Sequence, residues 1–125
     1  MLKGNQLTNE IIGSAIEVHR NLGPGLLEST YEECMAFELQ ERDLTVERQL
    51  ELPVLYKGNQ LEQNYRIDLL VNNQVIIELK SIKKIEPIHD AQLLTYLKLA
   101  NKKYGLLLNF NVPVMRQGIR RLLNG

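Results

Sequence analysis

Three ionisable residues stand inside two apolar runs of the sequence, YRIDLLV and VIIELK, which the pattern predicts to be neighbouring β-strands. Asp68 lies in the first run, and Glu78 and Lys80 lie in the second. Charged side chains among apolar neighbours are costly to bury unless another group pairs with them. Two carboxylates are hard oxygen ligands that suit Mg²⁺ or Mn²⁺, and a lysine beside them can hold water or stabilise charge on a phosphate. The three residues therefore predict metal-assisted chemistry on a phosphate ester.

The alternation of side chains along a strand predicts how the two runs pair. A three-residue loop at 72–74 makes one face of the hairpin wholly apolar, with Tyr65 on it. The pairs in this register are Val71 with Val75, Leu69 with Ile77, Ile67 with Leu79, and Asp68 with Glu78. A two-residue loop would mix apolar and charged side chains on both faces, which is penalised where one face is buried. We therefore predict that Asp68 lies beside Glu78, with Lys80 on the same face. A divalent cation would remove the repulsion between the two acids.

Periodicity and turn residues predict the elements that must position these side chains. Helices are expected from an N-cap at Thr8 to the break at Gly23, over 27–42, and over 87–100. Strands are expected at 45–56, 61–71, 75–81 and 104–109, and a short strand or helix at 118–123. Pro53 indicates that the first strand is an edge strand or contains a bulge. The order ααβββαβ predicts an α/β fold with a mixed sheet.

Length and composition suit one compact unit. The chain has 125 residues, 44% of them hydrophobic, which is enough for one domain with a core. No apolar run approaches the roughly 20 residues of a membrane span, and residues 1–10 lack a signal-peptide core, so we expect no membrane and a cytoplasmic location. The single Cys34 is expected in the core and cannot form an internal disulfide. His19 is expected to be a packing histidine.

The net charge of zero hides a gradient along the chain. Residues 1–43 carry three Lys and Arg against eight Asp and Glu, whereas residues 81–125 carry eight against two. A basic C-terminal third can bind phosphate groups electrostatically even though the whole molecule is neutral. Lys83 and Lys84 lie in this third and are candidate phosphate contacts. The alternative is that these lysines form only a solvated surface.

Longer motifs cover nearly the whole chain. They are Gly25-Leu26-Leu27-Glu28-Ser29-Thr30-Tyr31 and the segments VHRNLGPGLLESTY, IIELKS, HDAQLLTYLK and GLLLNF. With Asp68 and Glu78-Leu79-Lys80 on a hairpin followed by a helix, the sequence resembles the PD-(D/E)XK, or restriction-endonuclease-like, nuclease superfamily. It is further similar to the small bacterial GxxExxY proteins of that superfamily. The resemblance implies one nuclease-like domain over residues 1–125, with an αβββαβ core, a mixed sheet flanked by helices, and an extra N-terminal helix.

The resemblance also implies roles for individual residues. Asp68, Glu78, the carbonyl of Leu79 and Glu28 would bind Mg²⁺ or Mn²⁺, and Lys80 would position the attacking water. The helix after the hairpin resembles one that carries a Gln and a Tyr in some superfamily exonucleases, and these residues here are Gln92 and Tyr96.

Helix geometry bears on two of these roles. His89, Gln92 and Tyr96 are spaced i, i+3 and i+7, so they share one helix face, which either contacts substrate or makes hydrogen bonds within the core. Glu28 lies at the edge of an apolar stripe that contains Tyr31, and it is expected to face inward. The Tyr31 hydroxyl could orient Glu28, although packing is the commoner role of a tyrosine.

Together these features predict a Mg²⁺- or Mn²⁺-dependent nuclease, with DNA as the expected substrate. The alternative is a catalytically inactive binding or assembly module of the same fold. Loss of an acid or of Lys80 would favour the alternative, and none of them is missing. The chain has no Trp and two Phe for base stacking, so a second copy or a partner protein would supply specificity.

Overall fold

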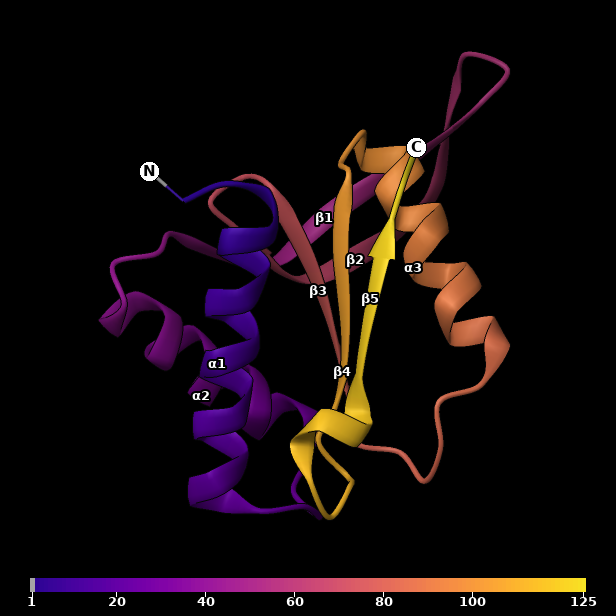
Figure 1. Cartoon of the computed structure of the whole chain (residues 1–125). Helices are drawn as coiled ribbons and strands as arrows, with labels where there is room; N and C mark the ends of the chain where they lie inside the picture. Colours follow the sequence, from indigo (N-terminus) through magenta and orange to yellow (C-terminus); the bar gives the residue numbers. More distant parts are fainter. Residues whose placement is uncertain (1) are drawn as a thin grey trace.

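The computed structural model describes residues 2–125 as a mixed β-sheet between two helical layers (Figure 1). The helices are α1 (Gly4–Leu22), α2 (Glu28–Glu41) and α3 (Pro87–Ala100), and a 3₁₀-helix, η1 (Met115–Gly118), precedes the last strand. The strands are β1 (Val46–Tyr56), β2 (Asn59–Val71), β3 (Val75–Lys80), β4 (Tyr104–Asn109) and β5 (Ile119–Leu123). The predicted α/β class, mixed sheet, flanking helices and extra N-terminal helix are confirmed.

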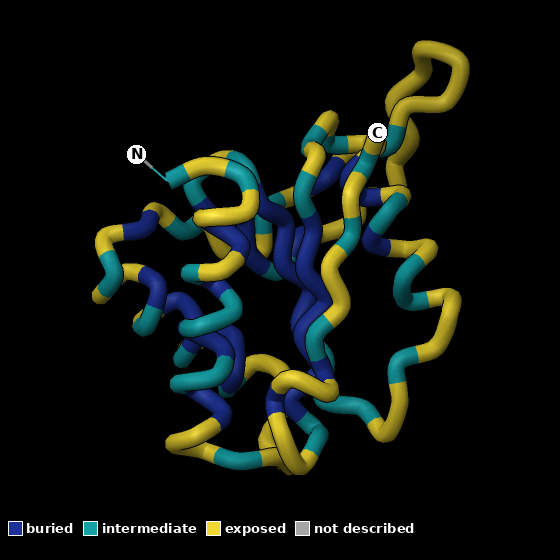
Figure 2. The backbone as a smooth tube through the Cα atoms, in the orientation of Figure 1, coloured by how far each residue is buried: buried dark blue, intermediate teal, exposed yellow. Residues whose placement is uncertain are grey.

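The sheet has the order β1-β2-β3-β4-β5, and its neighbours are antiparallel except for the parallel pair β3 and β4. The connection between these two strands runs through α3, as a parallel pair requires. Pro53 lies in edge strand β1, where the register also shifts between Pro53 and Leu55, so both readings of this proline are confirmed. The two central strands are buried on both faces, as the dark blue tube in Figure 2 shows.

Each face of the sheet has its own core. The larger core joins α1 and α2 to one face, where Leu7, Tyr31 and Leu69 are fully buried. The smaller core joins α3 to the other face, where Leu93 and Ile67 are buried. Burial of apolar surface on both faces therefore holds β3 and β4 in the middle of the molecule.

Most predicted boundaries agree with the structure within two residues, but α1 begins earlier than expected. Thr8 is fully buried inside the helix, and its hydroxyl donates a hydrogen bond to the carbonyl of Asn5 (3.0 Å), so the predicted N-cap is wrong. The apolar stripe extends to Leu7, whose burial carries the helix one turn further. Gly23 ends α1 as predicted, with φ of 69° and its N–H bonded to the carbonyl of His19 (2.7 Å).

The β2 strand changes the face that it presents at Asp68. Leu69 and Val71 pack in the α1/α2 core, whereas Ile67 packs in the α3 core and the Tyr65 ring lies 5.9 Å from the ring of Tyr96 on α3. The prediction that these four residues share one face is therefore wrong for Tyr65 and Ile67. On the neighbouring strand the register passes from Arg48 opposite Leu69 to Leu50 opposite Ile67, and the residue between them, Gln49, has φ of 50°. A non-glycine residue in this left-handed region interrupts the regular pleat.

Candidate active site

The acids lie where β2 and β3 separate. The predicted register is confirmed from Val71 opposite Val75 to Leu69 opposite Ile77, where the ladder ends. Beyond this pair the Asp68 side chain takes the place of a backbone partner, because its Oδ2 accepts a hydrogen bond from the N–H of Leu79 (2.8 Å). The predicted pairs of Asp68 with Glu78 and of Ile67 with Leu79 are not part of the ladder. The side chains of Ile67 and Leu79 lie in different cores. The strands open at Asp68, and the opening holds the carboxylates.

Glu78 is the buried member of the pair. Its side chain is on the α3 side of β3, it is 6% exposed, and its Oε1 accepts a weak hydrogen bond from the backbone N–H of Asp68 (3.5 Å). Burial raises the pKa of Glu78 to about 9, with further increases from the charge of Asp68 and from the hydrogen bond to its side chain. The charge of Lys80 acts in the opposite direction. At neutral pH the metal-free pair therefore holds a proton.

A backbone carbonyl completes the oxygen donors at this opening. In a strand the N–H and C=O of one residue point toward the same neighbour, and the N–H of Leu79 points to Asp68. The Leu79 carbonyl therefore also faces the opening. Two carboxylates and a carbonyl are hard oxygen donors, which fit Mg²⁺ or Mn²⁺, and a cation would replace the proton that the pair now holds.

Glu28 lies near this opening without joining the pair. It is the first residue of α2, and with Asp68 and Leu79 it lines a pocket of about 310 Å³ on the α2 side of the sheet. Its Oε2 accepts a hydrogen bond from the N–H of Ser81 (3.4 Å). Within residues 2–125, no three Asp, Glu, His or Cys side chains are close enough to hold a metal ion. The prediction that Glu28 faces inward is wrong: Glu28 and Leu27 are exposed, because the first turn of α2 extends beyond the apolar stripe.

Three further polar residues beside Asp68 escaped the sequence prediction. Glu32 is buried on α2, and its Oε2 pairs with the Nε (3.2 Å) and Nη2 (3.1 Å) of Arg48. The amide of Gln49 donates to Glu32 and also to Asp68 Oδ1 (3.3 Å). This network links α2 to the catalytic candidate Asp68. The spacing of Glu32 four residues after Glu28, on one helix face, is the sequence signal that could have indicated it.

The face of α3 that carries the predicted substrate contacts faces a groove of about 750 Å³. His89, Gln92 and Tyr96 line this groove together with Lys80, so the predicted shared face is confirmed. The Nδ1 of His89 accepts a hydrogen bond from the N–H of Glu86 (2.8 Å) in a capping box at the start of α3. Neutral His89 therefore carries its proton on Nε2. Lys83 and Lys84 are exposed in the loop before α3 and are not among the residues that line the groove.

Two contacts anchor the loops on either side of the opening. The Tyr31 hydroxyl donates to the carbonyl of Gly23 (2.6 Å) and accepts from the N–H of Leu26 (3.2 Å), and its ring stacks on Phe110 at 4.4 Å. Its bonds are thus to the loop before Glu28. Buried Asn109, at the end of β4, accepts from the N–H of Ile82 (3.1 Å) and donates to its carbonyl (3.0 Å).

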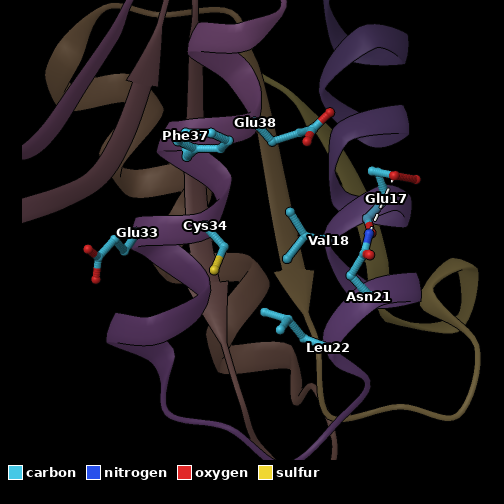
Figure 3. A pocket seen from close by; sticks show the side chains of 8 residues that line it. All are labelled: Glu17, Val18, Asn21, Leu22, Glu33, Cys34, Phe37 and Glu38. Atoms are coloured by element: carbon cyan, nitrogen blue, oxygen red, sulfur yellow. Dashed lines mark hydrogen bonds between the residues drawn. The ribbon is translucent and has the colours of Figure 1, made fainter.

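A separate pocket of about 380 Å³ lies between α1 and α2 (Figure 3). Cys34 points from α2 toward Val18 and Leu22 of α1, so it lines this pocket and is half-buried, not fully enclosed in the core as predicted. The pocket contains none of the acids of the opening. His19 is a packing histidine, as predicted, with its Nε2 2.8 Å from the carbonyl oxygen of Val112.

Residues 5–122 match the family model described as the PD-(D/E)XK nuclease superfamily. The match covers most of the chain, and the chain therefore belongs to this superfamily. Comparison with curated proteins and with solved structures gave no match. Among the helices described here, none is long and apolar enough to cross a membrane.

Proposed function

We propose that this chain is a divalent-metal-dependent nuclease that hydrolyses phosphodiester bonds in nucleic acid, with DNA as the expected substrate. The observation that carries the proposal is the buried carboxyl of Glu78 beside the half-buried Asp68. Burial of a carboxyl next to a second acid raises its pKa and is costly for a fold to maintain. Membership in the PD-(D/E)XK superfamily supports the assignment of that pair to nuclease chemistry.

Each residue of the opening has a role in this proposal. Asp68, Glu78 and the Leu79 carbonyl would hold Mg²⁺ or Mn²⁺, which supplies a Lewis acid and a water that deprotonates readily. Gln49 keeps the Asp68 carboxylate in place through Oδ1, while the Leu79 N–H holds Oδ2. Glu28 lines the same small pocket as Asp68. We assign to Glu28 the role of holding a water molecule that would bind the metal.

Lys80 acts from the other side of β3. It follows Glu78 by two residues and therefore projects toward the same α3 layer. Its ammonium would position the attacking water and stabilise the charge that develops on the phosphate. Gln92, Tyr96 and His89 face it across the groove and would contact the substrate backbone, with Lys83 and Lys84 contributing electrostatic attraction from the nearby loop.

The test is cleavage of labelled single- and double-stranded DNA and RNA by purified full-length protein, with Mg²⁺, with Mn²⁺ and with EDTA. We expect cleavage with metal, loss of cleavage in EDTA, and loss in Asp68→Asn. Asp43→Asn is the matched control, because Asp43 is exposed at the end of α2 with φ of 62°, a conformation that asparagine tolerates. Folded wild-type protein that cleaves none of the four substrates would favour an inactive binding or assembly module. Equal cleavage by wild type and Asp68→Asn would place the activity elsewhere.

The proposal extends to the setting of the enzyme. The motif from Gly25 to Tyr31 supports assignment to the GxxExxY group, and we expect the protein to act in the cytoplasm. A second copy or a partner protein would supply sequence specificity.

A further inference from the structure

The groove next to Lys80 has one wall that projects from the body of the molecule. Residues 53–64, at the far ends of β1 and β2, form a hairpin that extends past α3, and we call this hairpin the arm (Figure 1). Figure 2 shows the arm as an exposed yellow loop. The groove lies between the base of the arm and α3, and Lys80, two residues after Glu78, is one of its lining residues.

The lining of this groove is mostly apolar and aromatic, with the polar side chains of Gln92 and Thr95 also exposed in it. Tyr65 is 45% exposed on the arm side, and Ile88 is 69% exposed on the α3 side, together with Leu99. Of the described residues that line the groove, Lys80 alone carries a fixed positive charge. Duplex nucleic acid presents mainly phosphates to a protein, and surfaces that bind it are strongly basic. A mostly apolar groove with one lysine does not suit a duplex, whereas it does suit bases that have no partner strand.

Tyr65 is also connected to the acids through a second ring. Its ring lies 5.9 Å from that of Tyr96 at an angle of 48°, and Tyr96 is almost fully buried. Tyr96 lines the same groove as Tyr65 and Lys80, and Lys80 is two residues from Glu78. The exposed part of Tyr65 is therefore an aromatic surface one ring away from the proposed site of cleavage.

We infer that this groove binds the unpaired bases of a single-stranded nucleic acid and that Tyr65 is a stacking platform for a base next to the cleaved phosphate. The inference rests on the proposed function for the position of that phosphate. Base stacking on an aromatic side chain tolerates any sequence, because every base has a π-face. Tyr65 thus distinguishes single-stranded from double-stranded nucleic acid and does not read the base sequence.

The test is fluorescence anisotropy of the full-length protein in EDTA, so that no cleavage interferes. The probes are a labelled oligothymidylate, an abasic oligomer of the same length, and a duplex. We expect the oligothymidylate to bind most tightly and Tyr65→Ala to weaken it about tenfold or more, the loss that removal of one stacked base contact gives. Tyr65→Ala should leave binding of the abasic oligomer unchanged, and Tyr65→Phe should restore the affinity for oligothymidylate.

Tyr56→Ala is the matched control, because Tyr56 is a tyrosine near the tip of the same arm that is even more exposed than Tyr65 and does not line the groove. An equal loss in Tyr56→Ala and Tyr65→Ala would overturn the inference, and so would a duplex that binds as tightly as the single strand. Thermal unfolding of Tyr65→Ala shows whether this variant is still folded. Tyr65→Phe keeps the ring, so it tests stacking without a change in the packing of the groove. Base-dependent binding without cleavage would support the groove and reject the nuclease. Duplex cleavage that Tyr65→Ala leaves unchanged would support the nuclease and reject the groove.

Discussion

Replacement of Glu78 by glutamine removes the titratable group of the buried pair while preserving its shape. In the folded, metal-free protein the pKa of Glu78 is raised from 4.5 to about 9, chiefly by burial. The folded protein therefore binds this proton more tightly than the unfolded chain. Its contribution to the free energy of unfolding is fully present below pH 4.5 and is lost as the pH rises toward 9.

The size of the change in unfolding free energy follows from the shift in the pKa of Glu78. Between the two pKa values each pH unit changes the free energy of unfolding by about 1.4 kcal/mol for one proton. We therefore expect metal-free wild-type protein to lose on the order of 4 kcal/mol between pH 5.5 and pH 8.5 relative to Glu78→Gln. Glutamine does not ionise, so the variant should lack this component of the pH dependence. At pH 8.5 Glu78→Gln should be the more stable protein.

Urea unfolding in EDTA at pH 5.5, 7 and 8.5 measures this difference, and Glu62→Gln on the exposed part of β2 is the control. Mn²⁺ adds a second readout. Binding of the cation must displace the proton, so Mn²⁺ should stabilise wild type more at pH 8.5 than at pH 5.5 and should stabilise Glu78→Gln little at either pH. Parallel stability curves for wild type and Glu78→Gln in EDTA would refute the reasoning, because they would show that the pair holds no proton.

Substitutions at three other positions test the site and the fold around it. Lys80→Met should lower cleavage by roughly 10²-fold or more while the Mn²⁺ thermal shift survives, and exposed Lys3→Met should cut at the wild-type rate. Gln49→Ala and Gln49→Gly should both weaken Mn²⁺ binding in a thermal shift titration. Because φ at this position is 50°, Gln49→Gly should be more stable than Gln49→Ala by about 1 kcal/mol in urea unfolding. Gly118→Ala should cost several kcal/mol, since its Cβ would lie 1.9 Å from a backbone carbonyl oxygen. Gly58→Ala, which meets no atom, should cost only about 1 kcal/mol for its positive φ.

Hydrophobic alternation was sufficient to predict the hairpin register from Val71 to Leu69 and the closeness of Asp68 to Glu78, although these two acids are not a pair of the ladder. A slip by one residue would have exposed the buried side chains of both strands, so the correct register was strongly specified. The two asparagines at 72 and 73 take φ of 50° and 54°, which asparagine accepts more readily than most residues, and the turn agrees with the pattern. Local and tertiary preferences coincide here.

The change of face at Asp68 could not be predicted from the same pattern. It depends on the left-handed conformation of Gln49, and the segment Arg48-Gln49-Leu50 contains neither glycine nor proline to indicate a break. The conformation is held by tertiary contacts of the Gln49 amide to Glu32 and Asp68. Such contacts leave no trace in periodicity, and backbone strain of this kind is concentrated at functional sites.

The two anchors on the loops beside the opening have a consequence for hydrogen exchange. Tyr31 joins the loop before α2 to Phe110, and Asn109 joins the loop after β3 to the end of β4, so both loops are fastened to the C-terminal end of buried strand β4. The amides of Leu26 and Ile82 are bonded to these anchors and can open only when that part of the core opens. They should therefore exchange with deuterium at rates close to those of the β4 amides, whereas amides at the tip of the arm exchange quickly. The two loops that border the site should then stay in place until the core unfolds.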